Sequence, residues 1–256
     1  MLRRLRSISP ILMLTAAAVV GCEGPTDDGN EGEGEGEGEG EGEGEGEGEG
    51  EGEGEGEGEG EGEAPLCTGT QTLPSLTANN NNGLNVLDGR CTTITGRLTL
   101  TGPPGVSDAA PVRVVVQIGN DLIIDSGARL TDTDDFLGLT IIDDELRIED
   151  NSTITSLRLV VLEGIGRLTI KNNAALERIE LPALRSIAGD VSSDTIVIED
   201  NASLRVIDAP VLTRVSVDIT VDNNTSLCAD VMDDLVAGLT RYGGRYRQTN
   251  SVGSCN

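Results

Sequence analysis

Apolar residues recur along residues 96–227 in short steps of two and three positions, and the pattern repeats. Steps of two are typical of β-strands, in which successive side chains point to opposite faces. The first apolar positions of six similar phrases lie 22 to 28 residues apart. A fixed period of this length indicates a solenoid, in which each coil covers its neighbour. The six phrases are RLTLTG, DLIIDSGARL, ELRIEDNSTI, RLTIKNNAAL, TIVIEDNASL and DITVDNNTSL.

The segments between the later phrases share a second pattern. Apolar residues follow Ile154, Leu176 and Leu204 at the same offsets of 3, 5, 8 and 11 positions. We interpret the steps of three as corners, where the chain turns while its side chains still point inward. No long window fits the helical period of 3.6. The sequence therefore predicts an all-β protein with strands stacked about 4.8 Å apart.

Four of the phrases carry an asparagine three positions after their second apolar residue: Asn151, Asn173, Asn201 and Asn224. Asparagine at a corner tolerates left-handed backbone angles, and its amide can bond the backbone of its own or a neighbouring coil. We predict a structural asparagine ladder inside the solenoid. The alternative is four turn asparagines exposed to solvent.

Residues 229–239 place apolar side chains on one face of a predicted helix, which would cover the open C-terminal coil. The following RYGGRYR, residues 241–247, gathers three arginines and two tyrosines in one stretch. It fits either an anion or glycan site or an edge strand bent at its glycines.

Residues 1–22 have a basic start, an apolar run and a terminal Gly-Cys, which is the layout of an export signal. The apolar run is too short to span a bilayer. Val19–Cys22 resembles the lipobox of bacterial lipoproteins, which implies acylation of Cys22, removal of the leader and a location in the envelope, at the outer membrane or cell surface. An ordinary secretory signal with a chance cysteine is the alternative.

The formal charge of −27 is unevenly distributed. Residues 23–66 contain sixteen Glu-Gly pairs, carry −20 and cannot form a core, so we predict a disordered tether. Residues 67–256 carry −10 and form the predicted domain, for which a nucleic-acid partner is not expected.

The chain has no histidine, which excludes histidine catalysis and histidine metal ligands. Acidic turns at Asp132–Asp135 and Asp143–Glu145 lack an ordered ligand spacing, so we interpret them as a solvated face. The sequence predicts no enzyme, no cofactor and no metal site.

The phrase L-x-I-x-x-N-x-x-L, between two pairs of cysteines, resembles the receptor L domain, the ligand-binding lobe of insulin-receptor and EGF-receptor ectodomains. The resemblance implies a short right-handed β-solenoid over residues 67–256. Ile165–Asn173 also fits a leucine-rich repeat, which makes a helix-lined horseshoe the alternative fold. Cysteines 67, 91, 228 and 255 allow three pairings, and the resemblance implies Cys67–Cys91 and Cys228–Cys255, one pair at each end.

Three functions are compatible with these features. The first, which the resemblance favours, is a tethered surface module that binds or adheres to an unknown protein or glycan. The second is a structural envelope component without a specific ligand. The third is a secreted polysaccharide-active enzyme, since β-solenoids include polysaccharide lyases.

Overall fold

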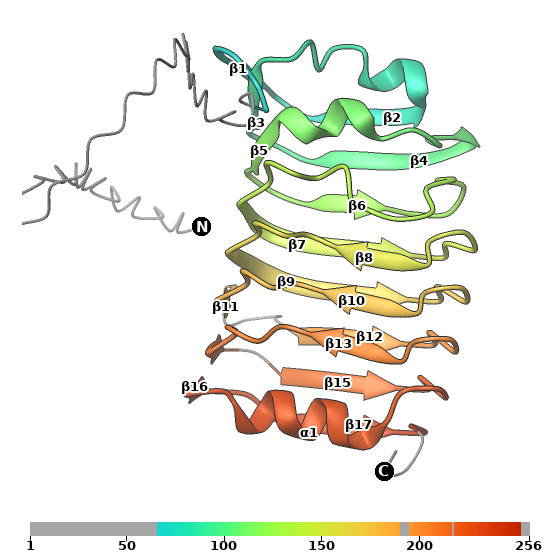
Figure 1. Cartoon of the computed structure of the whole chain (residues 1–256), viewed down its shortest axis with the longest axis vertical. Coiled ribbons are helices and arrows are strands. Elements are labelled where there is room, and N and C mark those ends of the chain that lie inside the picture. The colour runs from blue at the N-terminus through green and yellow to red at the C-terminus, as the bar shows by residue number, and fades with distance from the viewer. Residues whose placement is uncertain (1–65, 190–194, 217, 252–256) are drawn as a thin grey trace, which may run out of the picture. The chain divides into compact units, whose positions relative to one another are not determined.

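The protein forms a β-solenoid that is capped at its C-terminal end by a helix (Figure 1). This computed structural model describes residues 66–189, 195–216 and 218–251, with only the backbone of Thr195. The predicted leader (1–22) and all but the last residue of the predicted tether (23–66) lie outside the described residues. The solenoid prediction is confirmed by the parallel pairing of its coils.

Most strands belong to one sheet of 14 strands, which bends around two sides of the solenoid. Along the first side the strands are β1 (Thr70–Leu73), β3 (Cys91–Ile94), β5 (Val115–Ile118), β7 (Ile141–Glu149), β9 (Gly164–Lys171), β11 (Ser186–Ile187), β14 (Arg214–Val215) and β16 (Arg241–Tyr242). Along the second side, β7 and β9 continue beside β2 (Leu76–Asn80), β4 (Leu98–Gly105), β6 (Leu122–Ile124), β12 (Thr195–Glu199), β15 (Asp218–Asp222) and β17 (Tyr246–Thr249).

A smaller parallel sheet forms the third side of the solenoid. Its strands, in the order β13-β10-β8, are β8 (Ser156–Arg158), β10 (Arg178–Glu180) and β13 (Val206–Asp208). These strands occupy the first apolar steps after Ile154, Leu176 and Leu204, where the sequence predicted a shared pattern. The strands are short because the corners follow at once.

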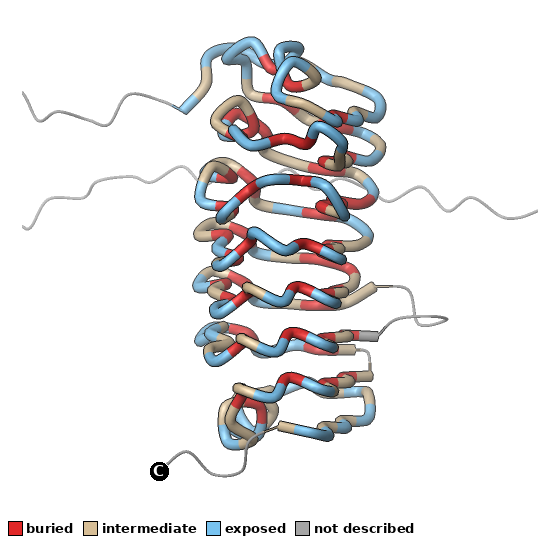
Figure 2. The backbone as a smooth tube through the Cα atoms, turned by 90° about the vertical axis from the view of Figure 1, so that its right-hand side faces the viewer, coloured by how far each residue is buried: buried red, intermediate tan, exposed pale blue. Residues whose placement is uncertain are grey.

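The repeated phrases stack in register. Ile148 pairs with Ile170, Ile170 with Ile198, and Ile198 with Val221. All four side chains are buried, and Figure 2 shows buried segments recurring at equivalent places of successive coils. Each coil therefore covers the apolar edge of the next, as the repeat predicted.

A second column, formed by the first apolar position of each phrase, extends beyond the six predicted coils at both ends. Leu76 of β2 pairs with Leu98, and Tyr246 of β17 pairs with Ile219. Leu76 begins a phrase with the offsets of the repeat, in which Ala78 and Leu84 are also buried, whereas Tyr246 does not. The last coil lacks such a phrase and is added by stacking, because an open strand edge with an apolar face can accept a strand that covers it.

Helices occupy only the ends of the described region. Two short 3-10 segments, η1 (Asn81–Leu84) and η2 (Ala110–Val114), lie in the first coils, and α1 (Ala229–Ala237) lies at the C-terminal end. The predicted capping helix is thus confirmed, with Met232 buried against the core. The helix-lined horseshoe is wrong, because the coils between these ends consist of strands and corners.

Close approach of successive coils also restricts residue type at one corner of β9. A Cβ atom at Gly166 would lie 2.5 Å from the carbonyl oxygen of Asp144 on the preceding coil. Only glycine leaves the room that this approach requires.

Candidate functional site: a polar sheet face

The four asparagines of the repeat lie inside the solenoid, each no more than 1% exposed. Asn173 shows the pattern: its Nδ2 donates to the carbonyl of Ile148 (3.0 Å) and to Oδ1 of Asn201 (3.1 Å). Its own Oδ1 accepts from the backbone N–H and the Nδ2 of Asn151 (both 3.2 Å). The amides form a continuous column that satisfies backbone groups at a corner where strand pairing stops.

The column ends at Asn151. Its Oδ1 is buried and has no hydrogen-bond partner within the described part of the chain. The preceding coil has no asparagine to continue the column, and Gly127 stands at the equivalent place. The first asparagine therefore donates but does not accept.

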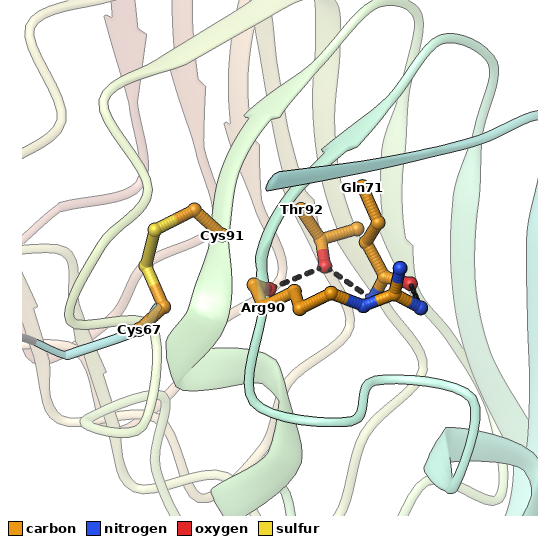
Figure 3. Close-up of a disulfide and its surroundings, with 5 residues drawn as sticks. All are labelled: Cys67, Gln71, Arg90, Cys91 and Thr92. Carbon is orange, nitrogen blue, oxygen red and sulfur yellow. Dashed lines mark hydrogen bonds between the residues drawn. A yellow bond between two sulfur atoms is a disulfide. The ribbon is translucent and has the colours of Figure 1, made fainter. Parts of the chain in front are cut away.

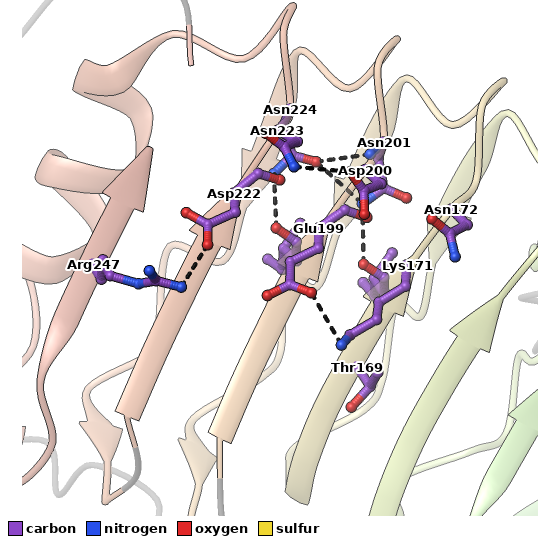
Figure 4. Close-up of polar contacts among 12 residues, drawn as sticks. Thr169, Lys171, Asn172, Glu199, Asp200, Asn201, Asp222, Asn223, Asn224 and Arg247 are labelled. Carbon is purple, nitrogen blue, oxygen red and sulfur yellow. Dashed lines mark hydrogen bonds and ion pairs between the residues drawn. The ribbon is translucent and has the colours of Figure 1, made fainter. Parts of the chain in front are cut away.

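The left-handed backbone angles at this corner belong to the residue before each ladder asparagine. Asp150, Asn172, Asp200 and Asn223 have φ between 56° and 58°. Our expectation that the ladder asparagine itself takes this conformation is wrong. Asx residues at this place form exposed bonds, such as Asn223 Nδ2 to Asp200 Oδ1 at 3.0 Å (Figure 4). Aspartate and asparagine are favoured here because they tolerate positive φ.

Cys67 and Cys91 form a disulfide with a Cα–Cα distance of 5.0 Å (Figure 3), which confirms this pairing. Beside it Thr92, which is fully buried, donates to the carbonyl of Arg90 and accepts from Gln71. A hydrogen bond from Arg90 lowers the pKa of Asp88. Together these contacts hold β1 on β3 at the N-terminal end.

Two predicted cysteine features involve residues outside those described. Cys228 immediately precedes α1 and is disulfide-bonded. Its predicted partner Cys255 and the predicted lipidation site Cys22 both lie outside the described residues. These assignments stay predictions.

The two acidic turns are stabilised by local bonds. Asp132 accepts from Thr131 and from the backbone of Asp134. Asp144 pairs with Arg167 at 3.0 Å. Within the described ranges no group of three metal-ligating side chains comes together.

The second side of the solenoid presents a polar face formed by β7, β9, β12 and β15. Its central row consists of side chains in register: Arg147, Thr169, Val197 and Thr220. Apart from Arg147, these side chains are short and half-buried. We call Thr169, Val197 and Thr220 the central strip.

Charged rows flank the central strip on both sides, and their members pair with one another. Lys171 contacts Glu199 of the same row at 3.0 Å, and Asp222 of that row contacts Arg247, which follows Thr220 in the central row, at 2.6 Å (Figure 4). On the other side Arg245 contacts Asp218 at 3.2 Å. The side chains of Lys171 and Glu199 are only 34% and 24% exposed, so they lie along the sheet rather than projecting from it.

This arrangement gives a flat surface that can make many weak contacts at once. The hydroxyl of Thr220 can donate and accept, whereas that of Thr169 already donates to Oε1 of Glu145 at 2.7 Å and can still accept. The flanking ion pairs can exchange partners with an incoming protein at modest cost. Such a surface suits recognition of an extended partner surface.

The RYGGRYR segment forms strands at the end of this sheet, as one of our two interpretations predicted. Arg241 lies on β16, next to Arg214 of β14. Arg245 and Arg247 lie on the other side of the corner and pair with acids of β15. The segment is therefore divided between two sides of the solenoid, and its arginines do not converge on one point.

Two grooves lie at the C-terminal end. One of about 430 Å³ is lined by Asp218, Thr220 and Arg247 together with neighbouring residues of β15 and β17. The other, of about 310 Å³, lies between β13 and α1. Sequence reasoning missed both, because each depends on how the last coil is closed.

Comparison with known protein families gives a match over part of the chain. Residues 140–234 match the Receptor L domain family. The match spans β7 to β15, the coils that build the polar face, and supports a receptor L-domain-like fold. No curated protein and no solved structure matches the chain. No helix in the described part of the chain is long and apolar enough to cross a membrane.

Proposed function

We propose that this protein is a non-enzymatic binding module, and that the central strip with its flanking ion pairs is its ligand surface. The observation that carries the proposal is the Receptor L domain match over the coils that build this face. The ligand class is a protein or a glycan with a flat, polar contact surface.

The geometry supports a binding role for this face rather than a purely structural one. The side chains needed to stack the coils point inward, where the apolar columns and the asparagine ladder are buried. Of the outward residues, Thr169 makes one side-chain hydrogen bond to the preceding coil, to Glu145, and Thr220 makes none among the described residues, yet both stand in register in one row. Short residues between charged rows leave room for the side chains of a partner.

We further propose that Cys22 is acylated and anchors the protein to the cell envelope, with residues 23–66 as a spacer. Two or more acyl chains make a lasting anchor, because each buried CH₂ contributes about 0.8 kcal/mol. As a flexible coil, 44 residues span about 35–40 Å, which would hold the domain away from the membrane surface. The polar face would then be accessible to extracellular partners.

Photo-crosslinking in intact cells tests the binding role. A photoreactive amino acid replaces Thr169 or Thr220 in the full chain, and a control chain carries it at Glu163, which is exposed outside the central strip. We expect a discrete cross-linked product from positions 169 and 220 and none from position 163. Equal products from all three positions, or none from any, would contradict this assignment of the face.

A further inference from the structure

The three-stranded sheet ends in two edges that the protein treats differently. An exposed strand edge presents unpaired N–H and carbonyl groups, and proteins commonly cover or block such edges. In this sheet the outer strands are β8 and β13. The two edges differ in whether the backbone groups that face away from β10 have hydrogen-bond partners.

The edge of β8 is closed by a side chain. The N–H of Arg158 donates to Oγ1 of Thr133 at 2.8 Å, and that hydroxyl donates to the carbonyl of Arg158 at 3.1 Å. Thr133 is 1% exposed. One buried hydroxyl thus satisfies both backbone groups that a further strand would otherwise pair.

Among the described residues, no side chain closes the edge of β13 in this way. Asp208 uses its carbonyl to accept from Leu181 on the β10 side, so strand alternation turns the N–H and carbonyl of Ile207 to the opposite side. The next coil supplies α1 there, and a helix cannot continue the ladder. Within the described residues, no backbone hydrogen bond joins Ile207 to α1.

A groove lies along this open edge. It has a volume of about 310 Å³, within the range of ligand sites, and is lined by Ile207, Ala209, Val231 and Leu235. The carboxylates of Asp208 and Asp234 lie at its rim. It therefore combines free backbone groups, an apolar floor and negative charge.

One row of outward-facing side chains crosses the three strands and ends in an acidic residue at the open edge. Arg158 is followed by Glu180, which it contacts at 3.4 Å, and then by Asp208 in register. No ion pair of Asp208 or Asp234 occurs among the described residues. A cation one strand beyond Asp208 would lie between these two carboxylates.

We propose that the groove between β13 and α1 binds an extended peptide segment of a partner protein as an added strand, with a lysine or arginine beside Asp208. Residues aligned with Ile207 and Ala209 would be apolar and point towards Val231 and Leu235. The residue between them would point outward and carry the positive charge. Main-chain bonds to Ile207 supply affinity, and alternate side chains supply specificity.

This site is separate from the polar face, so either can fail without the other. The neighbouring edge of β17 is flanked by Arg245 and Arg247, charges of the kind that discourage strand addition. The apolar floor and the acidic rim distinguish the β13 edge from it.

The test uses the full chain and a synthetic probe, acetyl-Ser-Thr-Val-Lys-Val-Ser-amide, followed by fluorescence anisotropy of its labelled form and by amide hydrogen exchange. We expect saturable binding and slower exchange of the Ile207 amide. A probe with glutamate in place of lysine should bind at least about tenfold more weakly. Methylation of the backbone nitrogens of both valines should weaken binding about fivefold, because main-chain donors are lost.

Matched variants of the protein locate the site. Asp208→Lys should weaken binding of the lysine probe at least about tenfold and restore binding of the glutamate probe. Glu177→Lys makes the same change of charge immediately before β10 and outside the groove, and should leave both probes unaffected. Equal effects of the two variants would overturn the proposal.

Two other outcomes would also overturn it. No saturable binding at millimolar probe would show that the groove does not accept a strand. If the Ile207 amide becomes protected as the concentration of the full chain rises without probe, the occupant is a second copy of the chain. Sedimentation of the same samples would show that self-association directly.

Discussion

Replacing Asn173 with alanine tests whether the buried amide column stabilises the solenoid. The side chain donates two hydrogen bonds and accepts two, and alanine removes all four. The N–H of Asn151 then loses its acceptor in the interior. An orphaned buried donor costs about 1–3 kcal/mol, and the other lost bonds raise the expected loss of unfolding free energy to about 2–4 kcal/mol.

The column also predicts a gradient between its members. Asn151 stands at the end and its Oδ1 accepts no hydrogen bond within the described chain. Asn151→Ala therefore leaves no backbone donor without its partner, and should cost about 1–2 kcal/mol less than Asn173→Ala. Asn201 accepts from Asn173 as Asn173 does from Asn151, so Asn201→Ala should resemble Asn173→Ala.

Urea unfolding of the full chain measures these differences. Asn172→Gly is the matched control: the neighbouring side chain is exposed, makes one bond to Asp150, and glycine tolerates its φ of 56°. We expect the control to change the free energy of unfolding by less than about 0.5 kcal/mol. A loss below this size for Asn173→Ala, or equal losses for Asn151 and Asn173, would refute the reasoning.

Four further outcomes follow. Cys22→Ala should move the protein from the membrane fraction to the soluble fraction; unchanged fractionation would contradict the proposed anchor. Replacing both Cys67 and Cys91 with serine should lower the free energy of unfolding by about 3 kcal/mol, because their 24-residue separation closes a long loop; an unchanged urea midpoint would contradict this. Gly166→Ala should lower the free energy of unfolding by more than about 1 kcal/mol, because the added Cβ would lie 2.5 Å from the carbonyl oxygen of Asp144. Gly69→Ser is the comparison: a Cβ there meets no atom within 4 Å, so any loss of stability measures the cost of its positive φ alone. Burial, with Asp108 and Asp132 nearby, raises the pKa of Asp135 above its usual 3.8. The contribution of Asp135 therefore favours folding at low pH and is lost as the pH rises from 3.8 through the raised value. Asp135→Asn should raise the melting temperature at pH 7 and not at pH 3, and a gain that is the same at both pH values would refute this cause.

Local repeats made much of the fold predictable. The columns of Ile148, Ile170 and Ile198 and the buried asparagines follow from a period that each coil repeats, because identical environments select identical residues. The left-handed residue was misplaced by one position. Aspartate and asparagine alternate at that site, and both are common at ordinary turns, so the sequence alone did not distinguish the strained position from the ladder.

The candidate surfaces were much less accessible to prediction. Thr169, Val197 and Thr220 are ordinary strand residues until the register of three separate coils places them in one row. The cap of Thr133 on Arg158 joins residues 25 positions apart without any shared motif. The groove beside Ile207 arises because the last coil supplies a helix where the earlier coils supply a strand.

The sequence by itself determined the coil, its period, the inward positions and the pairing residues of its interior, because these depend on contacts that every rung repeats. The tertiary structure decided which outward residues become neighbours, where the stack ends and which edge is left open. Those features depend on the register between coils and on how the first and last coils are covered. A periodic sequence pattern is the same whichever element covers its ends, so it does not specify them.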